Sequence, residues 1–248
     1  MARVTYDFTG NNYVVTGASS GIGRQIVIEL AEAGATVLAI ARREDKLREL
    51  TEIYPRQIEL GVVDVRSTDA IKSSVENFVK KHGKLDGGVH AAGIVAVTSL
   101  RSYDEEIAHS IMDISFWGMI NFMQVCSKAK LSNTAASYVL FSSTAASEGL
   151  KGKFAYSAAK AAVNTAAKSI AKELARRQQR VNTVMPGWVN TSMTQETSDV
   201  TDVDSIMEKE LLGVGQPTDV TGLVLFLLSD RSSWMTGSQI PVDGGYLA

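Results

Sequence analysis

The sequence predicts an α/β fold, in which one doubly wound sheet of seven mainly parallel strands carries helices on both faces. Two observations support this prediction. Short apolar runs rich in β-branched residues recur along the chain, and longer amphipathic stretches with helical periodicity alternate with them. No linker, internal repeat or low-complexity tract interrupts the alternation. At 248 residues, 45% of them hydrophobic, the chain is long enough for one well-buried core, so we expect a single domain over residues 1–248.

The expected strands are short and apolar, as strands buried on both faces of a parallel sheet are. They cover residues 13–15, 36–41, 58–63, 88–91, 138–141, 181–185 and 239–242. Helical patterns between them span residues 22–33, 68–81, 105–130, 154–177 and 219–228. Such sheets bind ligands beyond the carboxyl ends of their strands. Functional residues are therefore expected directly after strands.

Composition and charge exclude several classes of protein. The net charge of -2 provides no basic field that would attract nucleic acid. The single cysteine, Cys126, allows no internal disulfide and fits a reducing compartment. The longest strongly apolar run, residues 223–228, is too short to span a bilayer, and residues 1–10 lack the apolar core of a signal peptide. We therefore expect a cytoplasmic protein without nucleic-acid or membrane partners, and without a metal, since no cluster has metal-ligand spacing.

The segment TGASSGIG, residues 16–23, lies between the first expected strand and the first helix. Its glycines permit a tight turn, close approach of backbone to phosphate and close packing of helix on strand. The helix N-terminus adds unpaired N–H groups and the positive end of a dipole. A flexible turn is the alternative, but this position favours a dinucleotide. The residues expected to contact it are Gly17, Ser19, Ser20, Gly21, Ile22 and Gly23.

The end of the second strand indicates which dinucleotide binds. An acidic residue there would bind the ribose 2′-hydroxyl of NAD, whereas this strand runs into Arg42 and Arg43. A guanidinium suits a 2′-phosphate through charge-assisted, bidentate hydrogen bonds. Arginines are otherwise unfavourable at a helix start because they oppose the helix dipole. The pair therefore predicts NADP rather than NAD.

Tyr156 and Lys160 open the helical stretch after the fifth strand. Their spacing of four puts phenol and ammonium on one helix face, where the ammonium is expected to lower the tyrosine pKa. Ser142 and Ser143 end the preceding strand and offer a hydroxyl that could polarise a carbonyl. Tyrosine and lysine at this spacing are frequent by chance, so the combination with the serines carries the prediction of an acid/base site.

Over nearly its whole length the sequence resembles the short-chain dehydrogenase/reductase family, including its 3-oxoacyl-carrier-protein reductases. The ordered motifs are residues 16–23, Asp64-Val65, Ala92-Gly93, Ser143, Tyr156 with Lys160, Pro186-Gly187, and residues 242–245. The resemblance implies a Rossmann-type fold and hydride transfer between nicotinamide and a carbonyl or secondary alcohol.

The resemblance also assigns roles to individual residues. Tyr156 is the acid/base, Ser143 orients the carbonyl, and Lys160 binds the nicotinamide ribose and lowers the tyrosine pKa. The thirteen-residue spacing to Tyr156 selects Ser143 over Ser142. Asp64 and Val65 would contact adenine, although Asp64 could instead cap the following helix. Further expected cofactor contacts are Ala92, Gly93, Pro186, Gly187, Val189 and Thr191.

Two positions depart from the family pattern. Ala91 stands where the family usually has asparagine, and Ser115 replaces the helix asparagine that completes a proton relay to the lysine. His90, beside the first, is expected to be packed rather than catalytic. Ser115 is a possible relay residue. These losses motivate an alternative function, a catalytically weak NADP-binding sensor or assembly protein on the same fold.

Residues 192–215 form an acidic stretch that we expect to be a substrate lid. Its charge argues against an acidic acyl carrier protein as partner and for a free small-molecule carbonyl or alcohol substrate. A basic face could still form elsewhere, from Lys128, Lys130, Arg176, Arg177 and Arg180. By the resemblance, the helical stretches at 105–130 and 154–177 pair between subunits, which predicts a homodimer or homotetramer.

Overall fold

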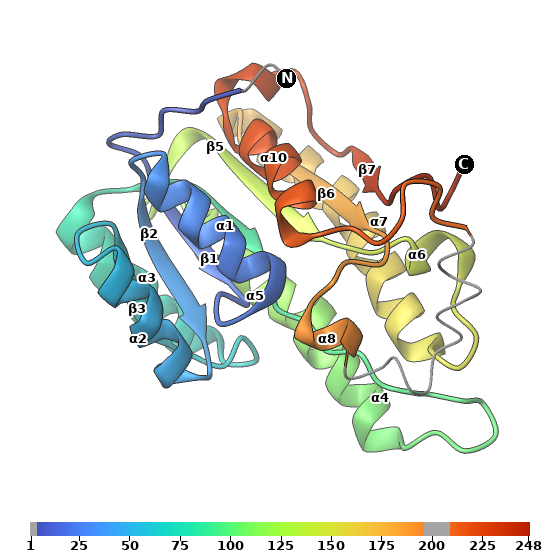
Figure 1. Ribbon diagram of the computed structural model, residues 1–248. Coiled ribbons are helices and arrows are strands. Elements are labelled where there is room, and N and C mark those ends of the chain that lie inside the picture. Colours follow the sequence, from blue (N-terminus) through green and yellow to red (C-terminus); the bar gives the residue numbers. More distant parts are fainter. Residues whose placement is uncertain (1–3, 196–208) are drawn as a thin grey trace.

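The computed structural model describes residues 4–195 and 209–248 and confirms the doubly wound α/β fold (Figure 1). Its seven-stranded sheet has the order β3-β2-β1-β4-β5-β6-β7, and all neighbouring strands are parallel. The strands are β1 (Asn12–Thr16), β2 (Thr36–Ala41), β3 (Ile58–Val62), β4 (Leu85–His90), β5 (Ser132–Phe141), β6 (Arg180–Pro186) and β7 (Gln239–Val242).

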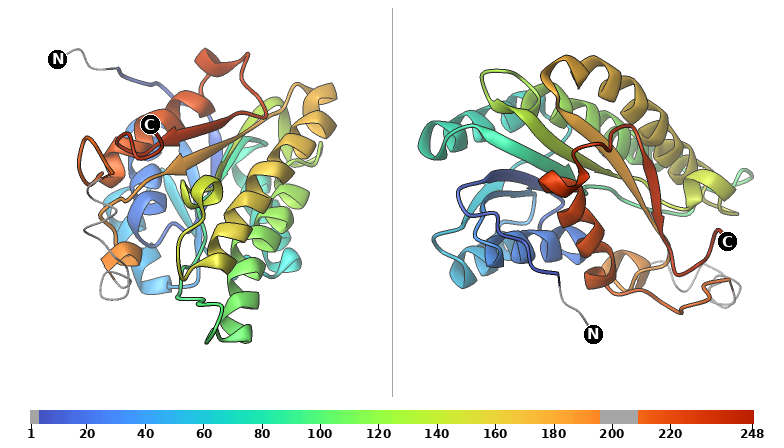
Figure 2. Two further views of the ribbon diagram at one scale, coloured as in Figure 1. Left: turned by 90° about the vertical axis from the view of Figure 1, so that its right-hand side faces the viewer. Right: turned by 90° about the horizontal axis from the view of Figure 1, so that it is seen from above.

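Helices cover both faces of the sheet, as Figure 2 shows. One face carries α1 (Gly21–Glu32), α2 (Glu44–Ile53) and α10 (Pro217–Leu228). The other carries α3 (Thr68–His82), α5 (Gly118–Cys126) and α7 (Phe154–Leu174). The short helices are α4 (Glu105–Met112), which packs along α7, α6 (Ala145–Glu148) and α8 (Ser192–Gln195).

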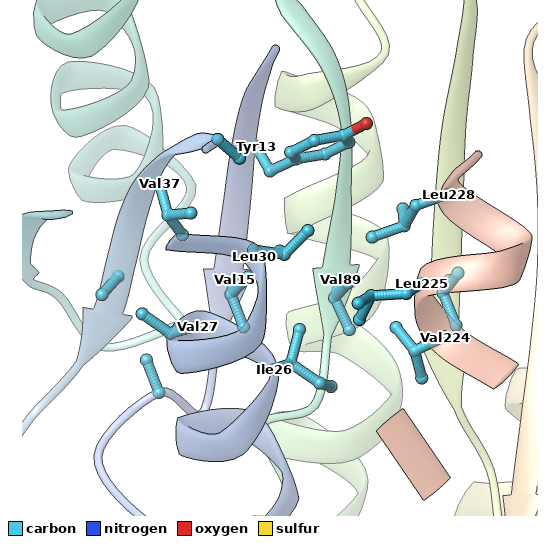
Figure 3. Packing of buried hydrophobic residues seen from close by; sticks show 14 of the residues in the cluster. Tyr13, Val15, Ile26, Val27, Leu30, Val37, Val89, Val224, Leu225 and Leu228 are labelled. Carbon is cyan, nitrogen blue, oxygen red and sulfur yellow. The ribbon is translucent and has the colours of Figure 1, made fainter. Parts of the chain in front are cut away.

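The alternation of side chains along β1 divides the core into two layers. Tyr13 and Val15 pack against α1 on one face, whereas Val14 packs on the opposite face, because successive strand residues point to opposite sides. Figure 3 shows the layer that contains Val15 of β1, together with Leu30 of α1 and Leu228 of α10. Burial of β1 on both sides explains the apolar run of residues 13–15 at its centre.

The expected helix over residues 105–130 is present, but it is shorter than predicted and is not α-helical throughout. A π-helical turn, Asp113–Trp117, separates α4 from α5, and the helix ends at Cys126. At this end the Ser127 hydroxyl donates to the Met123 carbonyl oxygen at 2.6 Å, in addition to the Ser127 N–H. The π turn contains Ser115. Helix α2 was not predicted, because its strongly charged sequence buries only Leu47 and Leu50.

Two of the five residues that were expected to form a basic face, Arg177 and Arg180, bind backbone carbonyls instead. Arg177 donates to the backbone carbonyls of Ser127 and Ser132, at 2.7 and 2.8 Å. Arg180 is 8% exposed and bonds the carbonyls of Leu227 and Ser229. Both guanidinium groups satisfy carbonyls at element ends, which sequence alone does not reveal.

The strand order reverses between β1 and β4, because β1 continues to β2 on one side and pairs with β4 on the other. In such a sheet this switch point opens a crevice at the carboxyl ends of the strands. None of the helices in the described ranges is long and apolar enough to cross a membrane.

Candidate active site

A cavity of about 500 Å³ lies at these carboxyl ends and extends from the turn after β1 to the segment after β6. Most of the predicted site residues line it. They are Gly17, Ser19, Ser20, Gly21, Ile22, Gly23, Arg42, Arg43, Asp64, Val65, Ala92, Gly93, Ser143, Tyr156, Lys160, Pro186, Gly187, Val189 and Thr191. Ser115 is fully buried behind the cavity wall.

The turn after β1 requires glycine at two positions. Gly17 has φ of 71°, and a Cβ there would lie 2.7 Å from the Ala91 carbonyl carbon at the end of β4. A Cβ at Gly23 would lie 2.4 Å from the Gly17 carbonyl oxygen. The turn therefore packs tightly against β4 and α1 without side chains. It leaves the N-terminus of α1, whose first turn carries no acidic residue, facing the cavity as an anion cradle.

Both arginines after β2 line the cavity beside this cradle. The Arg43 guanidinium donates to the hydroxyls of Ser19 and Ser20, at 2.9 and 2.7 Å. Serine hydroxyls and guanidinium groups are good donors to phosphate oxygens. The residues present thus fit a pyrophosphate at the turn and a further phosphate at the arginines.

Asp64 does not cap α3, the alternative that its sequence position left open. Ser67 is the N-cap, and its hydroxyl accepts from the Ala70 N–H at 3.2 Å. Asp64 instead pairs with Arg66 at 2.6 Å, and this hydrogen-bonded guanidinium lowers the pKa of the carboxyl. Its side chain remains at the cavity wall.

Helix α7 brings Tyr156 and Lys160 to one end of the cavity, with the Lys160 ammonium 5.6 Å from the Tyr156 ring centre. Ser143 enters from the segment after β5, and its hydroxyl lies within hydrogen-bonding reach of the Tyr156 phenol. Ser142 points elsewhere, since its hydroxyl donates to the Lys160 carbonyl oxygen at 2.9 Å. The two adjacent serines therefore have different environments, and Ser143 faces the phenol.

The pKa values at this end of the cavity are set mainly by burial. Burial lowers the pKa of Lys160 to about 8. The pKa of Tyr156 is raised, because burial outweighs the opposing hydrogen bond from Ser143. The net direction thus differs from the lowering that the neighbouring Lys160 is expected to produce. A phenol with a raised pKa keeps its proton at neutral pH, which is the form that a general acid needs.

Comparisons with known proteins identify the family of the chain. A family model described as enoyl-(acyl carrier protein) reductase matches residues 17–247. The 3-oxoacyl-[acyl-carrier-protein] reductase of Thermotoga maritima is 35% identical over 95% of this chain and 97% of its own, and that of Staphylococcus aureus strain Mu50 is 33% identical over 94% and 96%. The chain belongs to the short-chain dehydrogenase/reductase family. It is accordingly an oxidoreductase.

Solved structures of short-chain dehydrogenases/reductases share the fold over almost the whole chain. One from Brucella melitensis has a TM-score of 0.92 and 27% identity, and the match covers 98% of this chain and 99% of that one. Carveol dehydrogenase from Mycobacterium avium, solved in complex with NAD, has a TM-score of 0.89 and 28% identity, with the same coverage. Both structures thus share the fold of this chain, although their sequences are less than 30% identical to it.

Of the two departures from the family pattern, Ala91 lines the cavity, whereas Ser115 and the neighbouring His90 lie behind its catalytic end. Ser115, in the π turn, is fully buried, and its hydroxyl has no hydrogen-bond partner among the described residues. His90 is 1% exposed and its Nδ1 lies 3.0 Å from the Thr16 hydroxyl. Burial, followed by the nearby Lys160 ammonium, lowers the pKa of His90 to about 3, so the imidazole is neutral. His90 is packed, as expected.

A second, smaller cavity was not predicted from the sequence. It has a volume of about 70 Å³ and shares Ser143 and Tyr156 with the large one. Lys153, Trp188 and Glu210 line it. The position of Lys153, three residues before Tyr156, was the one available signal, but nothing in the local sequence indicates that this lysine is buried.

Other reactive side chains do not form a second site. Cys126 is fully buried, and burial raises the pKa of its thiol, which makes it a poor nucleophile. Across residues 4–195 and 209–248, no three His, Cys, Asp or Glu side chains are grouped so as to hold a metal ion. Of the expected lid, residues 196–208 lie outside the described part of the chain.

Proposed function

We propose that the protein is an NADP(H)-dependent oxidoreductase that interconverts a small-molecule carbonyl compound and its secondary alcohol. The observation that carries this proposal is the convergence of Ser143, Tyr156 and Lys160 at one end of a glycine-cradled cavity. The names of the 3-oxoacyl-[acyl-carrier-protein] reductases that it resembles support a carbonyl substrate.

The preference for NADP rests on Arg42 and Arg43. Both line the cavity after β2, where an NAD enzyme would carry an acidic residue for the ribose hydroxyls. The Arg43 guanidinium bridges Ser19 and Ser20, so cationic and hydroxyl donors converge at this point. A 2′-phosphate would find charge-assisted donors here, whereas NAD would leave the two cations unpaired.

A nicotinamide cofactor held along the cavity would supply the hydride for the reduction of the carbonyl carbon. Ser143 donates a hydrogen bond to the carbonyl oxygen and orients it toward the Tyr156 phenol. The Tyr156 hydroxyl transfers its proton to that oxygen as the alcohol forms. Lys160 stabilises the resulting phenolate, because an adjacent ammonium favours the charged form of the tyrosine. Lys160 also donates to the Phe141 carbonyl oxygen at 2.9 Å, a contact that positions its ammonium.

Oxidation of NADPH in the presence of a panel of free ketones and oxo acids tests the proposal. We expect turnover with NADPH, slower turnover with NADH, and loss of turnover when Tyr156 is replaced by Phe. Tight NADPH binding without reduction of any panel compound would contradict it and favour the sensor or assembly role.

A further inference from the structure

A buried carboxyl group, that of Glu210, lines the small cavity beside Tyr156. Ser143 and Tyr156 form part of the same wall, so a substrate whose carbonyl meets these two residues lies next to Glu210. Glu210 is 4% exposed, and its Oε2 atom has no hydrogen-bond partner among the described residues. A buried polar atom without a partner is costly, because it has lost its hydration and gained nothing in return. A ligand group that hydrogen-bonds Oε2 would remove this cost.

The other carboxyl oxygen of Glu210 is fixed by the backbone after β6. Oε1 accepts from the Trp188 N–H, and Gly187 leaves room for this contact, since a Cβ there would lie 2.6 Å from Oε1. The backbone of Glu210 is held as well, because its carbonyl oxygen accepts from the Gly213 N–H at 2.8 Å. Anchoring Trp188 requires only one carboxyl oxygen. Structural support of this segment therefore accounts for Oε1 and leaves Oε2 without a role.

The neighbouring carboxyl group, that of Asp243, is engaged elsewhere. Its two oxygens accept from the Gly245 and Leu247 N–H groups, each at 3.1 Å. Burial raises the pKa of Glu210, the hydrogen bond from the Trp188 N–H opposes this shift, and the charge of Asp243 adds to it. Glu210 is thus closer to its neutral form than an exposed glutamate would be.

A hydroxyl group is the ligand that suits Oε2 in either protonation state of Glu210. It can donate to the carboxylate or accept from the carboxylic acid. An ammonium group would have to enter beside a second cation, because Lys153 lines the same cavity. A carboxylate would approach both Glu210 and the charge of Asp243. An alkyl group would leave Oε2 unpaired.

We propose that Glu210 is a specificity-determining residue that hydrogen-bonds a hydroxyl group of the substrate, so that the enzyme prefers hydroxy ketones to unsubstituted ketones. The inference rests on the proposed function and narrows its substrate class. The carbonyl would contact Ser143 and Tyr156, and the hydroxyl would contact Oε2 of Glu210. The cavity has a volume of about 70 Å³, so the two groups of the substrate must be close together.

Isosteric pairs of ketones test this preference, with NADPH as reductant. Hydroxyacetone is compared with butanone, and 4-hydroxybutan-2-one with pentan-2-one, so that each pair exchanges a hydroxyl for a methyl group. For the wild-type protein we expect a higher kcat/KM for the hydroxy ketone in at least one pair. In Glu210→Met the ratio of hydroxy ketone to isostere should fall roughly 5- to 150-fold, the range for a buried group that loses its partner. Glu210→Gln should retain part of the ratio, because an amide also hydrogen-bonds a hydroxyl.

The ratio separates recognition of the hydroxyl from structural support. Loss of the contact with Trp188 in Glu210→Met would weaken both members of a pair alike, and the intrinsic reactivities of the ketones cancel between variant and wild type. Glu148→Met is the matched control, since this carboxylate of α6 lies outside the cavity wall and pairs with Lys209 at 3.3 Å. It should leave the ratio unchanged, and thermal unfolding verifies that each variant is folded. Equal kcat/KM within both pairs for the wild type, or equal losses of both members in Glu210→Met, would overturn the inference.

Calorimetry distinguishes failure of the inference from failure of the proposed function. The titrants are propane-1,2-diol and butan-2-ol, each added to the wild-type protein and to Glu210→Met after saturation with NADPH. Binding of the diol that depends on Glu210, without turnover of any ketone, would support recognition of a hydroxyl and reject the reductase. Turnover of ketones with no Glu210-dependent preference for the hydroxy ketones or the diol would retain the reductase and reject recognition of a hydroxyl.

Discussion

At the scale of single residues, burial determines which protonation states the site offers. Burial raises the pKa of Tyr156 and lowers that of Lys160 to about 8, so each group moves toward its neutral form. A neutral phenol is the form that can donate a proton in the proposed reduction.

Replacing Tyr156 with Phe removes the proton donor. We expect kcat to fall by roughly 10²–10⁴-fold, the usual contribution of general acid–base catalysis, with NADPH affinity retained. For the wild-type protein, the acid form is required, so the reduction rate should be level around neutral pH and fall as the pH rises through the raised tyrosine pKa. Steady-state kinetics across pH and fluorescence titration with NADPH measure both effects. A Phe variant as active as the wild type would refute the mechanism.

Replacing Arg42 with Asp should exchange a phosphate donor for an acceptor of ribose hydroxyls. Losing a charged hydrogen bond costs about 1.5–3 kcal/mol, so NADPH should bind at least tenfold more weakly while NADH binds more tightly. Dissociation constants of both cofactors, for wild type and variant, provide the measurement. Equal affinity of the wild type for NADH and NADPH would disprove the preference.

Ser115 has a supporting role in the proposed mechanism. Its unpartnered hydroxyl can hold a water near Lys160, since a Cβ added at Gly93 would lie 3.4 Å from both the Ser115 Oγ and the Lys160 Nζ. Ser115→Ala should therefore reduce kcat much less than Tyr156→Phe, and Ser115→Asn should be neutral or faster. A Ser115→Ala loss as large as that of Tyr156→Phe would make Ser115 essential rather than supportive.

At the scale of elements, the unit formed by β1, its glycine turn and α1 is the most constrained. Gly23→Ala would place a methyl group 2.4 Å from the Gly17 carbonyl oxygen, and both partners belong to rigid backbone. We expect a destabilisation of about 1–3 kcal/mol, as for other overpacked sites, together with weaker NADPH binding. Denaturant unfolding and cofactor titration measure the two losses.

Gly222→Ala in α10 is the control for this substitution. It is also a helical glycine, but it is exposed and a Cβ there meets no atom within 4 Å. Alanine should stabilise this helix by up to about 1 kcal/mol because of its higher helix propensity. Equal effects of the two substitutions would show that the turn is not tightly packed.

At the scale of the whole molecule, the face formed by α4, the π turn and α7 exposes several large apolar side chains. Ile107, Trp117 and Phe154 are exposed by 40%, 54% and 41%. The left view of Figure 2 shows α4 and α7 side by side, and the contacts between them agree. We propose that this face pairs two copies of the chain, as the family resemblance predicts.

Trp117→Glu should shift the protein toward monomers, because the apolar contact would gain a buried charge. Sedimentation equilibrium of the purified protein measures the shift. Ile53→Glu is the control, since Ile53 has the same 54% exposure but lies on α2 at the opposite edge of the sheet. A wild-type monomer, or an equal response to both substitutions, would reject this face as the interface.

The sequence by itself determined the sheet, most of its long helices and most of the residues that line the large cavity. The reason is that these features are local: alternating apolar periods, a glycine turn between a strand and a helix, and side chains four residues apart on one helix face. The family resemblance added the choice of Ser143. The glycine turn, Arg42, Arg43, Tyr156 and Lys160 all follow from the sequence as site residues, and they line one cavity in the structure.

Only the tertiary structure decided how deeply each ionisable side chain is buried and which residues it contacts. Burial reversed the expected direction of the Tyr156 pKa, and carbonyls at element ends took Arg177 and Arg180 away from the expected basic face. Packing of distant segments likewise put Lys153 next to Trp188 and closed the small cavity with Glu210. Desolvation depends on atoms from the whole chain, so no local pattern of residues specifies it.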